Sequence, residues 1–187
     1  METVTPPVVA RRGCLIAKVL TLTLIASSLF AQSQTVPEYN AKAGYLSTFT
    51  NYATWPADAF ASAASPTVLC VLGQDPFGDV LDKTAAASRG NRPLHVRRIR
   101  TPNAAAGCQL VFIAKAESRN EAEWLAALKN KPVLTVGESG QTVARGGAVE
   151  FATVRDKIVF DVNLMGTEPS GVKLSSDLLS HARKVYR

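Results

Sequence analysis

Short apolar segments that alternate with helix-forming segments constrain the fold of this chain more than any other feature. Three of them, Thr67–Leu72, Cys108–Ala114 and Val133–Val136, are apolar almost throughout. A strand without a polar face has to be covered on both sides, which is typical of a parallel sheet between two layers of helices. Because segments with helical spacing separate these strands, the sequence predicts an α/β domain.

The first two helices are predicted from apolar spacing and from residues that suit helix ends. A helix over residues 38–54 ends before Trp55-Pro56, because the residue that precedes a proline avoids the helical region. Asp75 and Pro76 suit the N-cap and first position of a second helix, and Gly90 follows its end.

Two further helices are predicted toward the C-terminus. Ser118 and Glu121 form a capping box for the first of them, and Ser175 caps the last. The predicted buried stripe of the last helix comprises Leu178, Ala182 and Val185.

The remaining strands complete a single three-layer domain. Residues 93–99 form a strand, and residues 148–153 and 158–163 alternate as a hairpin around Val154–Lys157. We therefore predict a mainly parallel central sheet of about six strands, flanked by helices, with a C-terminal antiparallel hairpin.

Residues 1–31 have the order of a secretory signal peptide. Arg11, Arg12 and Lys18 precede the apolar run Val19–Phe30, and small residues follow. We predict cleavage after Ala31, which leaves residues 32–187 as an exported, periplasmic domain. Two alternatives stay open: a twin-arginine signal, and an uncleaved anchor whose apolar run is shorter than the roughly 20 residues of a membrane span.

Composition is that of a globular chain with a modest positive charge. The chain is 47% hydrophobic and 19% charged, with a net charge of +6 that becomes +4 without residues 1–31. The basic residues form no concentrated block, so the charge does not indicate nucleic-acid binding.

Two cysteines remain once Cys14 leaves with the signal peptide. An even number in an oxidising compartment favours one disulfide between Cys70 and Cys108. The bond would close a loop of 38 positions, which the loop-entropy treatment values at about 4 kcal/mol. Two separate buried thiols are the alternative.

The sequence offers no pattern of catalytic, cofactor-binding or metal-ligating residues. Gly73–Gly78 follows a strand but lacks GxGxxG spacing, and Gly137–Gln141 is not GxSxG. His95 and His181 have no serine or cysteine partner in the sequence, and no HxH, HExxH or CxxC spacing occurs. We therefore expect no enzyme, cofactor or metal.

One cluster of basic residues stands out, between Arg92 and Arg100. Arg92, Arg97 and Arg98 are candidates for binding an anion or an acidic partner. The alternative is a solvated edge strand that charge protects from aggregation.

Eight short motifs occur in the order found in the YfiR-like periplasmic proteins, and together they cover about residues 40–185. They are Lys42–Leu46 with Trp55-Pro56, Leu69–Gly78, Gly90–Leu94, Cys108–Ile113, Pro132–Val136, Gly146-Gly147, Phe160–Leu164 and Leu174–Ser176. The chain thus resembles this family over nearly all of its mature length.

The resemblance implies a regulator and not a catalyst. Such proteins bind the periplasmic sensor domain of an inner-membrane diguanylate cyclase and hold it inactive, which lowers cyclic di-GMP and biofilm formation. An outer-membrane-associated lipoprotein can sequester them, and they form homodimers. Carried onto this chain, Cys70 and Cys108 would be the structural bridge.

The segment after the last strand of the hairpin departs from the family and is the predicted partner surface. Leu164, Met165 and Val172 are apolar residues in a segment with Gly and Pro, where a core role is less assured. Packing of this loop onto its own core is the alternative.

Two other functions are compatible with the sequence. A periplasmic small-ligand sensor or carrier would have a pocket at the carboxyl ends of the parallel strands, near Gly73 and Glu138. An exported hydrolase would depend on His95 or His181.

Overall fold

The computed structural model describes residues 35–187, within which Glu38–Arg187 form one compact unit. The helices are α2 (Thr35–Tyr52), α3 (Val80–Ala87), α4 (Glu121–Leu128) and α5 (Ser176–His181). The main sheet contains β2 (Thr67–Leu72), β3 (Leu94–Ile99), β4 (Leu110–Ile113), β5 (Leu134–Gly137), β6 (Val149–Val154), β7 (Lys157–Asn163) and β9 (Lys184–Tyr186). The predicted signal peptide, residues 1–31, lies outside the described residues. No helix within residues 35–187 is long and apolar enough to cross a membrane.

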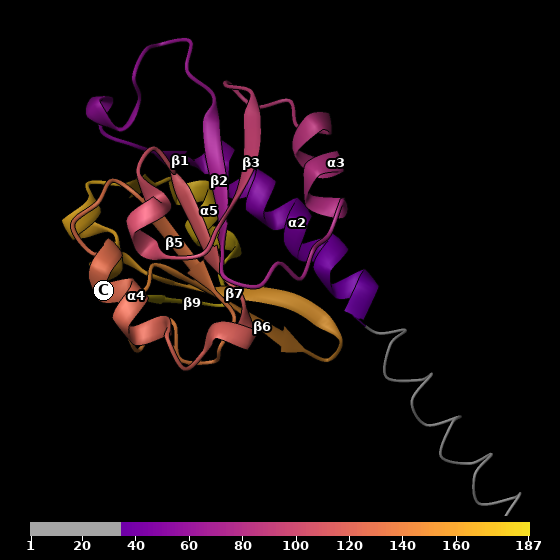
Figure 1. The fold of residues 1–187 in the computed structure, drawn as a ribbon. Coiled ribbons are helices and arrows are strands. Elements are labelled where there is room, and N and C mark those ends of the chain that lie inside the picture. The colour runs from indigo at the N-terminus through magenta and orange to yellow at the C-terminus, as the bar shows by residue number, and fades with distance from the viewer. Residues whose placement is uncertain (1–34) are drawn as a thin grey trace, which may run out of the picture. The chain divides into compact units, whose positions relative to one another are not determined.

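The main sheet has seven strands in the order β3-β2-β4-β5-β6-β7-β9 (Figure 1). All neighbouring pairs are parallel except β6 and β7, which form an antiparallel hairpin. The short strands β1 (Ala53–Thr54) and β8 (Lys173–Leu174) pair separately. The predicted α/β fold, with a mainly parallel sheet and a C-terminal hairpin, is confirmed.

The two faces of the sheet are covered by different helices. Apolar residues of α2, α3 and α5 pack on one face, in the larger core cluster. Leu125 and Leu128 of α4 pack on the other face, against β2 and β4 (Figure 1). Strands β2 and β4 are apolar on both sides because both sides are covered, as the sequence predicts.

Aromatic packing fixes α2 against the hairpin. The Phe49 ring stacks on Phe151 with centroids 5.7 Å apart and meets Phe160 edge-on at 5.0 Å. Tyr45 contacts the same two hairpin rings. Contacts of this geometry add about 0.5–1.5 kcal/mol each to the burial of the rings.

The predicted starts of α3 and α4 are wrong. Helix α3 begins at Val80, because the Asp75 carboxylate closes a tight turn by accepting from the Phe77 amide at 2.8 Å. Helix α4 begins at Glu121 and has no side-chain cap, so the capping box with Ser118 does not form. The Glu121 side chain is fully buried and instead accepts from the hydroxyl of Thr142, in the loop after β5.

The C-terminal helix is capped as predicted but is shorter than predicted. Ser175 accepts from the Leu178 amide, and α5 ends at His181. Ala182 and Val185 therefore do not continue a helical stripe. The Arg183 amide donates to the Phe160 carbonyl at 2.8 Å, and the chain continues as β9 beside β7. Pairing with an open strand edge thus overrides the local helical pattern.

The hairpin turn is formed by two residues in the left-handed region. Arg155 and Asp156 have φ of 49° and 60°. A two-residue turn with both φ values positive matches the twist of the flanking strands, and Asn-Gly suits it best. Two non-glycine residues there store backbone strain.

Replacing this pair by Asn-Gly (Arg155→Asn with Asp156→Gly) should stabilise the protein by about 1 kcal/mol, because it removes that strain. Urea unfolding measures the change. Asp156→Val should act in the opposite direction, since a β-branched residue tolerates positive φ least. Equal stability of both variants would contradict the prediction.

Candidate functional site

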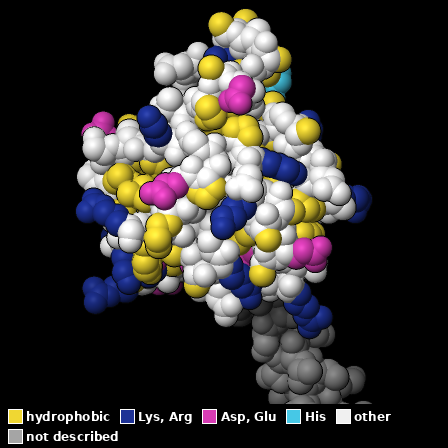
Figure 2. Space-filling view, turned by 90° about the vertical axis from the view of Figure 1, so that its left-hand side faces the viewer, with side chains coloured by type: hydrophobic (Ala, Val, Ile, Leu, Met, Phe, Trp, Pro, Cys, Tyr) yellow, Lys and Arg dark blue, Asp and Glu magenta, His cyan; other side chains and the backbone are white. Residues whose placement is uncertain are grey.

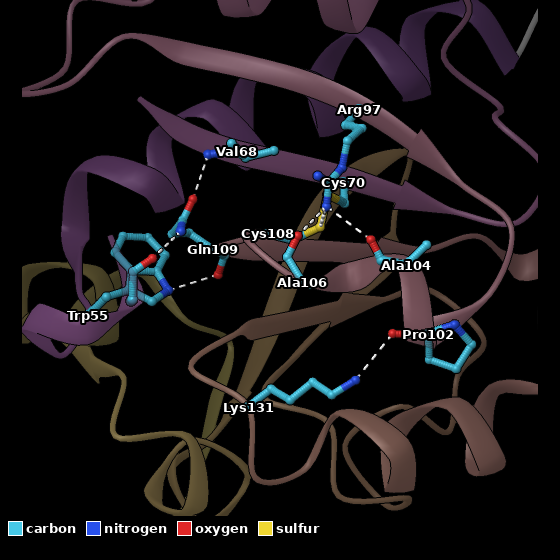
Figure 3. The surroundings of a disulfide bond; sticks show 11 residues. Trp55, Val68, Cys70, Arg97, Pro102, Ala104, Ala106, Cys108, Gln109 and Lys131 are labelled. Carbon is cyan, nitrogen blue, oxygen red and sulfur yellow. Dashed lines mark hydrogen bonds between the residues drawn. A yellow bond between two sulfur atoms is a disulfide. The ribbon is translucent and has the colours of Figure 1, made fainter. Parts of the chain in front are cut away.

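The structure joins Cys70 of β2 to Cys108, which lies just before β4, by a disulfide with Cα atoms 5.9 Å apart (Figure 3). Both cysteines are buried. Arg97 reaches across from β3, where its guanidinium bonds the carbonyls of Ala104 and Ala106 and lies 2.9 Å from the Cys108 sulfur. The bond is therefore enclosed by the chain and ties the segment entering β4 to β2.

Next to the disulfide, Gln109 connects three segments (Figure 3). Its side chain accepts from the Val68 amide at 2.8 Å and donates to the Ala59 carbonyl at 2.6 Å. The Trp55 indole donates to the Gln109 carbonyl at 2.8 Å. This end of the sheet is thus held by one covalent bond and by a buried polar side chain with satisfied partners.

The three arginines predicted to bind an anion do not form a shared site. Arg92 stacks on Phe60 at 4.0 Å and bonds the carbonyls of the 62–65 loop. The Arg97 guanidinium is hydrogen-bonded beside the disulfide. The Arg98 side chain lies on the opposite face of β3, because successive residues of a strand alternate between its two faces. The prediction of one anion-binding cluster is therefore wrong.

Arg98 pairs with two carboxylates. It donates to Asp75 at 2.9 Å and, through both terminal nitrogens, to Asp82. Hydrogen bonds from Arg98 hold the pKa of Asp82 below its usual value, against the smaller opposing effect of burial. Arg98 thus fixes α3 beside β3 and has no free edge for a ligand.

A hollow lies beyond the carboxyl ends of β2 and β3, and the side chain of Glu117 lines it. In such sheets ligands bind where the strand order reverses, here between β2 and β4. At this point Glu117 accepts from the Gln74 amide at 3.0 Å and packs on Gly73, where a Cβ would lie 2.4 Å from its oxygen. A carboxylate therefore takes the place that an anionic ligand would need.

The Glu138 carboxylate is likewise bound by groups of the chain itself. It accepts from the Tyr39 hydroxyl at 3.0 Å, from the Lys115 amide at 2.9 Å and from the ammonium of Lys42, which also pairs with Glu38. The side chains of Lys42 and Glu138 are 5% and 3% exposed. Burial, with the charge of Glu138, raises the pKa of Tyr39 well above its usual value. A hollow borders Gly73 and Gln74 at this end of the sheet, as the ligand-pocket alternative expects, whereas Glu138 does not line it.

A second buried carboxylate, Glu121, organises the loop after β5. It accepts from the Thr142 hydroxyl at 2.6 Å, from Ser139, and from Arg145 at 2.8 Å. The loop from Glu138 to Gly147 is thereby fixed to the start of α4.

Sequence reasoning missed Glu121 and Glu138 as buried groups. The partners of these carboxylates lie between 18 and 99 residues away along the chain. Neither residue belongs to a local pattern that would have marked it, and Glu121 looked like a helix cap.

The predicted partner residues divide between core and surface. Val172 is 3% exposed and belongs to the larger core cluster, so its assignment to a partner surface is wrong. Leu164 packs partly against the same core, whereas Met165 is 56% exposed. The turn that holds Met165 lies close to the Gly146-Gly147 backbone, where a Cβ on Gly166 would be 2.7 Å from the Gly147 carbonyl.

Neither histidine belongs to a constellation of catalytic residues. His95 and His181 are both exposed, and His181 contacts its own helix through Ser180 and the Asp177 carbonyl. Within residues 35–187 no three His, Cys, Asp or Glu side chains are grouped as metal ligands. Within the described residues, buried side-chain polar atoms have hydrogen-bond partners, with the exception of Asn163 Oδ1.

Comparison with known proteins gives a family and a fold. The sequence profile of the YfiR/HmsC-like family matches residues 39–183. The crystal structure of a conserved domain protein from Vibrio cholerae O1 biovar El Tor is similar in fold, with a TM-score of 0.50 at 10% identity. That similarity covers 64% of this chain and 54% of the Vibrio chain, so the chain spans about half of the other's length.

Replacing both cysteines (Cys70→Ala with Cys108→Ala) should lower the free energy of unfolding by about 2–5 kcal/mol, because the unfolded chain loses its cross-link. Urea unfolding of the oxidised wild type and the double variant measures the difference. Dithiothreitol should destabilise the wild type and leave the variant unchanged. Equal midpoints for the oxidised wild type and the variant would show that the bond adds no stability.

Arg98→Gln should lower stability at pH 7 by at most about 1 kcal/mol, since the pair is partly exposed to solvent. Because the pKa of Asp82 is lowered in the folded state, the stabilisation is present above the unfolded value of about 4 and is lost as the pH falls through the folded value. The difference between wild type and variant in urea unfolding should therefore shrink at acidic pH. Lys129→Gln is the control, and a difference independent of pH would contradict the assignment.

Proposed function

The chain belongs to the YfiR/HmsC-like family, and from this membership we propose that it is a periplasmic regulator of an inner-membrane diguanylate cyclase. It binds the periplasmic sensor domain of the cyclase and represses it, which lowers cyclic di-GMP and biofilm formation. The match over residues 39–183 is the observation that carries the proposal.

Periplasmic location is supported by two independent features. The first 31 residues have the order of a cleavable signal peptide, with the cut near Ala31. The Cys70–Cys108 disulfide suits an oxidising compartment. The mature domain would then be residues 32–187.

Regulation by binding is supported by how the chain uses its polar residues. Glu117, Glu121 and Glu138 bond to other groups of the chain at the sheet edge where α/β enzymes hold substrates. We accordingly assign it no catalytic activity.

Exposed apolar residues after β7 are assigned to one part of the partner surface. Met165 is the large hydrophobic side chain most exposed among the described residues, and Leu164 precedes it. We further propose that the protein acts as a homodimer and that an outer-membrane-associated lipoprotein sequesters it to release the cyclase.

Deleting the gene in its native host should raise cellular cyclic di-GMP, because repression of the cyclase is lost. The nucleotide is measured in extracts of the deletion strain complemented with the intact gene or with one that lacks residues 1–31. Only the intact gene should restore the low level, since the shortened product stays in the cytoplasm. Unchanged cyclic di-GMP in the deletion strain, under conditions where the gene is expressed, would overturn the proposal.

A further inference from the structure

Part of the sheet carries side chains that no helix covers. In the hairpin, Phe151 and Phe160 point into the core beneath α2. The alternate residues Ala152, Val154 and Val159 therefore point to the opposite side. None of these three belongs to the core cluster that α4 forms on that side, and Val154 is 40% exposed.

Strand register brings these residues into one patch. Ala152 lies opposite Val159, and Val154 lies opposite Lys157. Residues paired in this way have Cβ atoms about 4.5–5.5 Å apart. On the far side of β7, Lys184 and Tyr186 of β9 pair with Asp161 and Asn163. The residues of this outer face are Ala152, Val154, Lys157, Val159, Lys184 and Tyr186.

The covered part of the same sheet side ends at two buried polar residues. Glu150 accepts from the amides of Thr142 and Val143, and Asn163 donates to the Val143 carbonyl. The loop after β5 therefore covers the start of β6 and the end of β7. The hairpin continues beyond this loop and away from α4 (Figure 1).

The outer face is positively charged. Asp161 forms an ion pair with Arg183, and the buried Glu150 accepts from loop amides beneath the covered part of the sheet. Lys157 and Lys184 make no ion pair within residues 35–187, and Lys184 lies 4.3 Å from the centroid of the Tyr186 ring. Basic residues are frequent on the face of the molecule drawn in Figure 2 as well, where Lys and Arg outnumber Asp and Glu. The outer face thus has an apolar centre with unpaired cations beside it.

We infer that the outer face of β6, β7 and β9 docks the periplasmic domain of the regulated cyclase, through a partner surface with an apolar centre and an acidic rim. This inference rests on the proposed function. Apolar side chains at the centre of an interface supply most of its binding energy, and complementary charges at the rim favour encounter and select the partner.

Charge argues against a second copy of this chain as the occupant. In a two-fold dimer the same surface meets itself, so the lysines of one copy would face a surface that carries the same lysines. Like charges brought together at an interface are unfavourable. An acidic partner instead supplies the carboxylates that Lys157 and Lys184 lack.

The test is Lys157→Glu combined with Lys184→Glu, expressed at native level in the deletion strain. Both side chains are exposed, so the variant should fold and reach wild-type abundance. Cyclic di-GMP should rise to the level of the deletion strain. The matched control is Arg100→Glu with Lys129→Glu, two exposed residues outside the outer face, which changes the net charge equally and should repress like the wild type.

A photocrosslinking amino acid, p-benzoylphenylalanine, at position 154 identifies the occupant directly. In irradiated cells the crosslinked partner, identified by mass spectrometry, should be a membrane protein with a diguanylate cyclase domain. The crosslink should be lost when Lys157→Glu and Lys184→Glu are also present. An adduct between two copies of the chain would overturn the inference in favour of self-association. So would full repression by the lysine variant in a host where gene deletion raises cyclic di-GMP. If deletion has no effect, the proposed function fails and the inference fails with it.

Discussion

The structure depends on strands that are apolar on both faces. Strands β2 and β4 must be shielded from water on two sides, which requires α2, α3 and α5 on one side and α4 on the other. The same requirement explains the buried carboxylates. Loops that cover such strands bring backbone amides and hydroxyls into the interior, and Glu121 and Glu150 satisfy them there. The polar network follows from the apolar sheet.

Helices cover both faces of the sheet at its centre. At one side, no helix covers the outer face of β6, β7 and β9. At the centre, Glu117 and Glu138 accept hydrogen bonds from the chain at the edge where related architectures hold ligands. At the hairpin, the outer side of β6 and β7 lacks a helix layer. The inferred docking of a partner on this sheet face accords with the proposed regulatory function.

The sequence predicts the fold well where the signal is a continuous local pattern. The strand Thr67–Leu72 has the predicted bounds, and Ser175 caps α5 as expected. Predictions fail where a distant group competes for a residue. Asp75 is used by a turn and by Arg98, and residues 184–186 pair with β7. The prediction of a shared anion site fails for the same reason. Arg92, Arg97 and Arg98 are close in sequence, but the alternation of side chains along β3 and their separate partners keep them apart.

The bond network of α2 also sets the order in which the domain can be completed. Tyr39 and Lys42 belong to α2, yet both contact Glu138, which follows them by 99 and 96 residues. During synthesis Lys42 is made before Glu138, so at first the lysine lacks its buried partner. The buried contacts of α2 are therefore complete only once the chain has been made as far as Glu138.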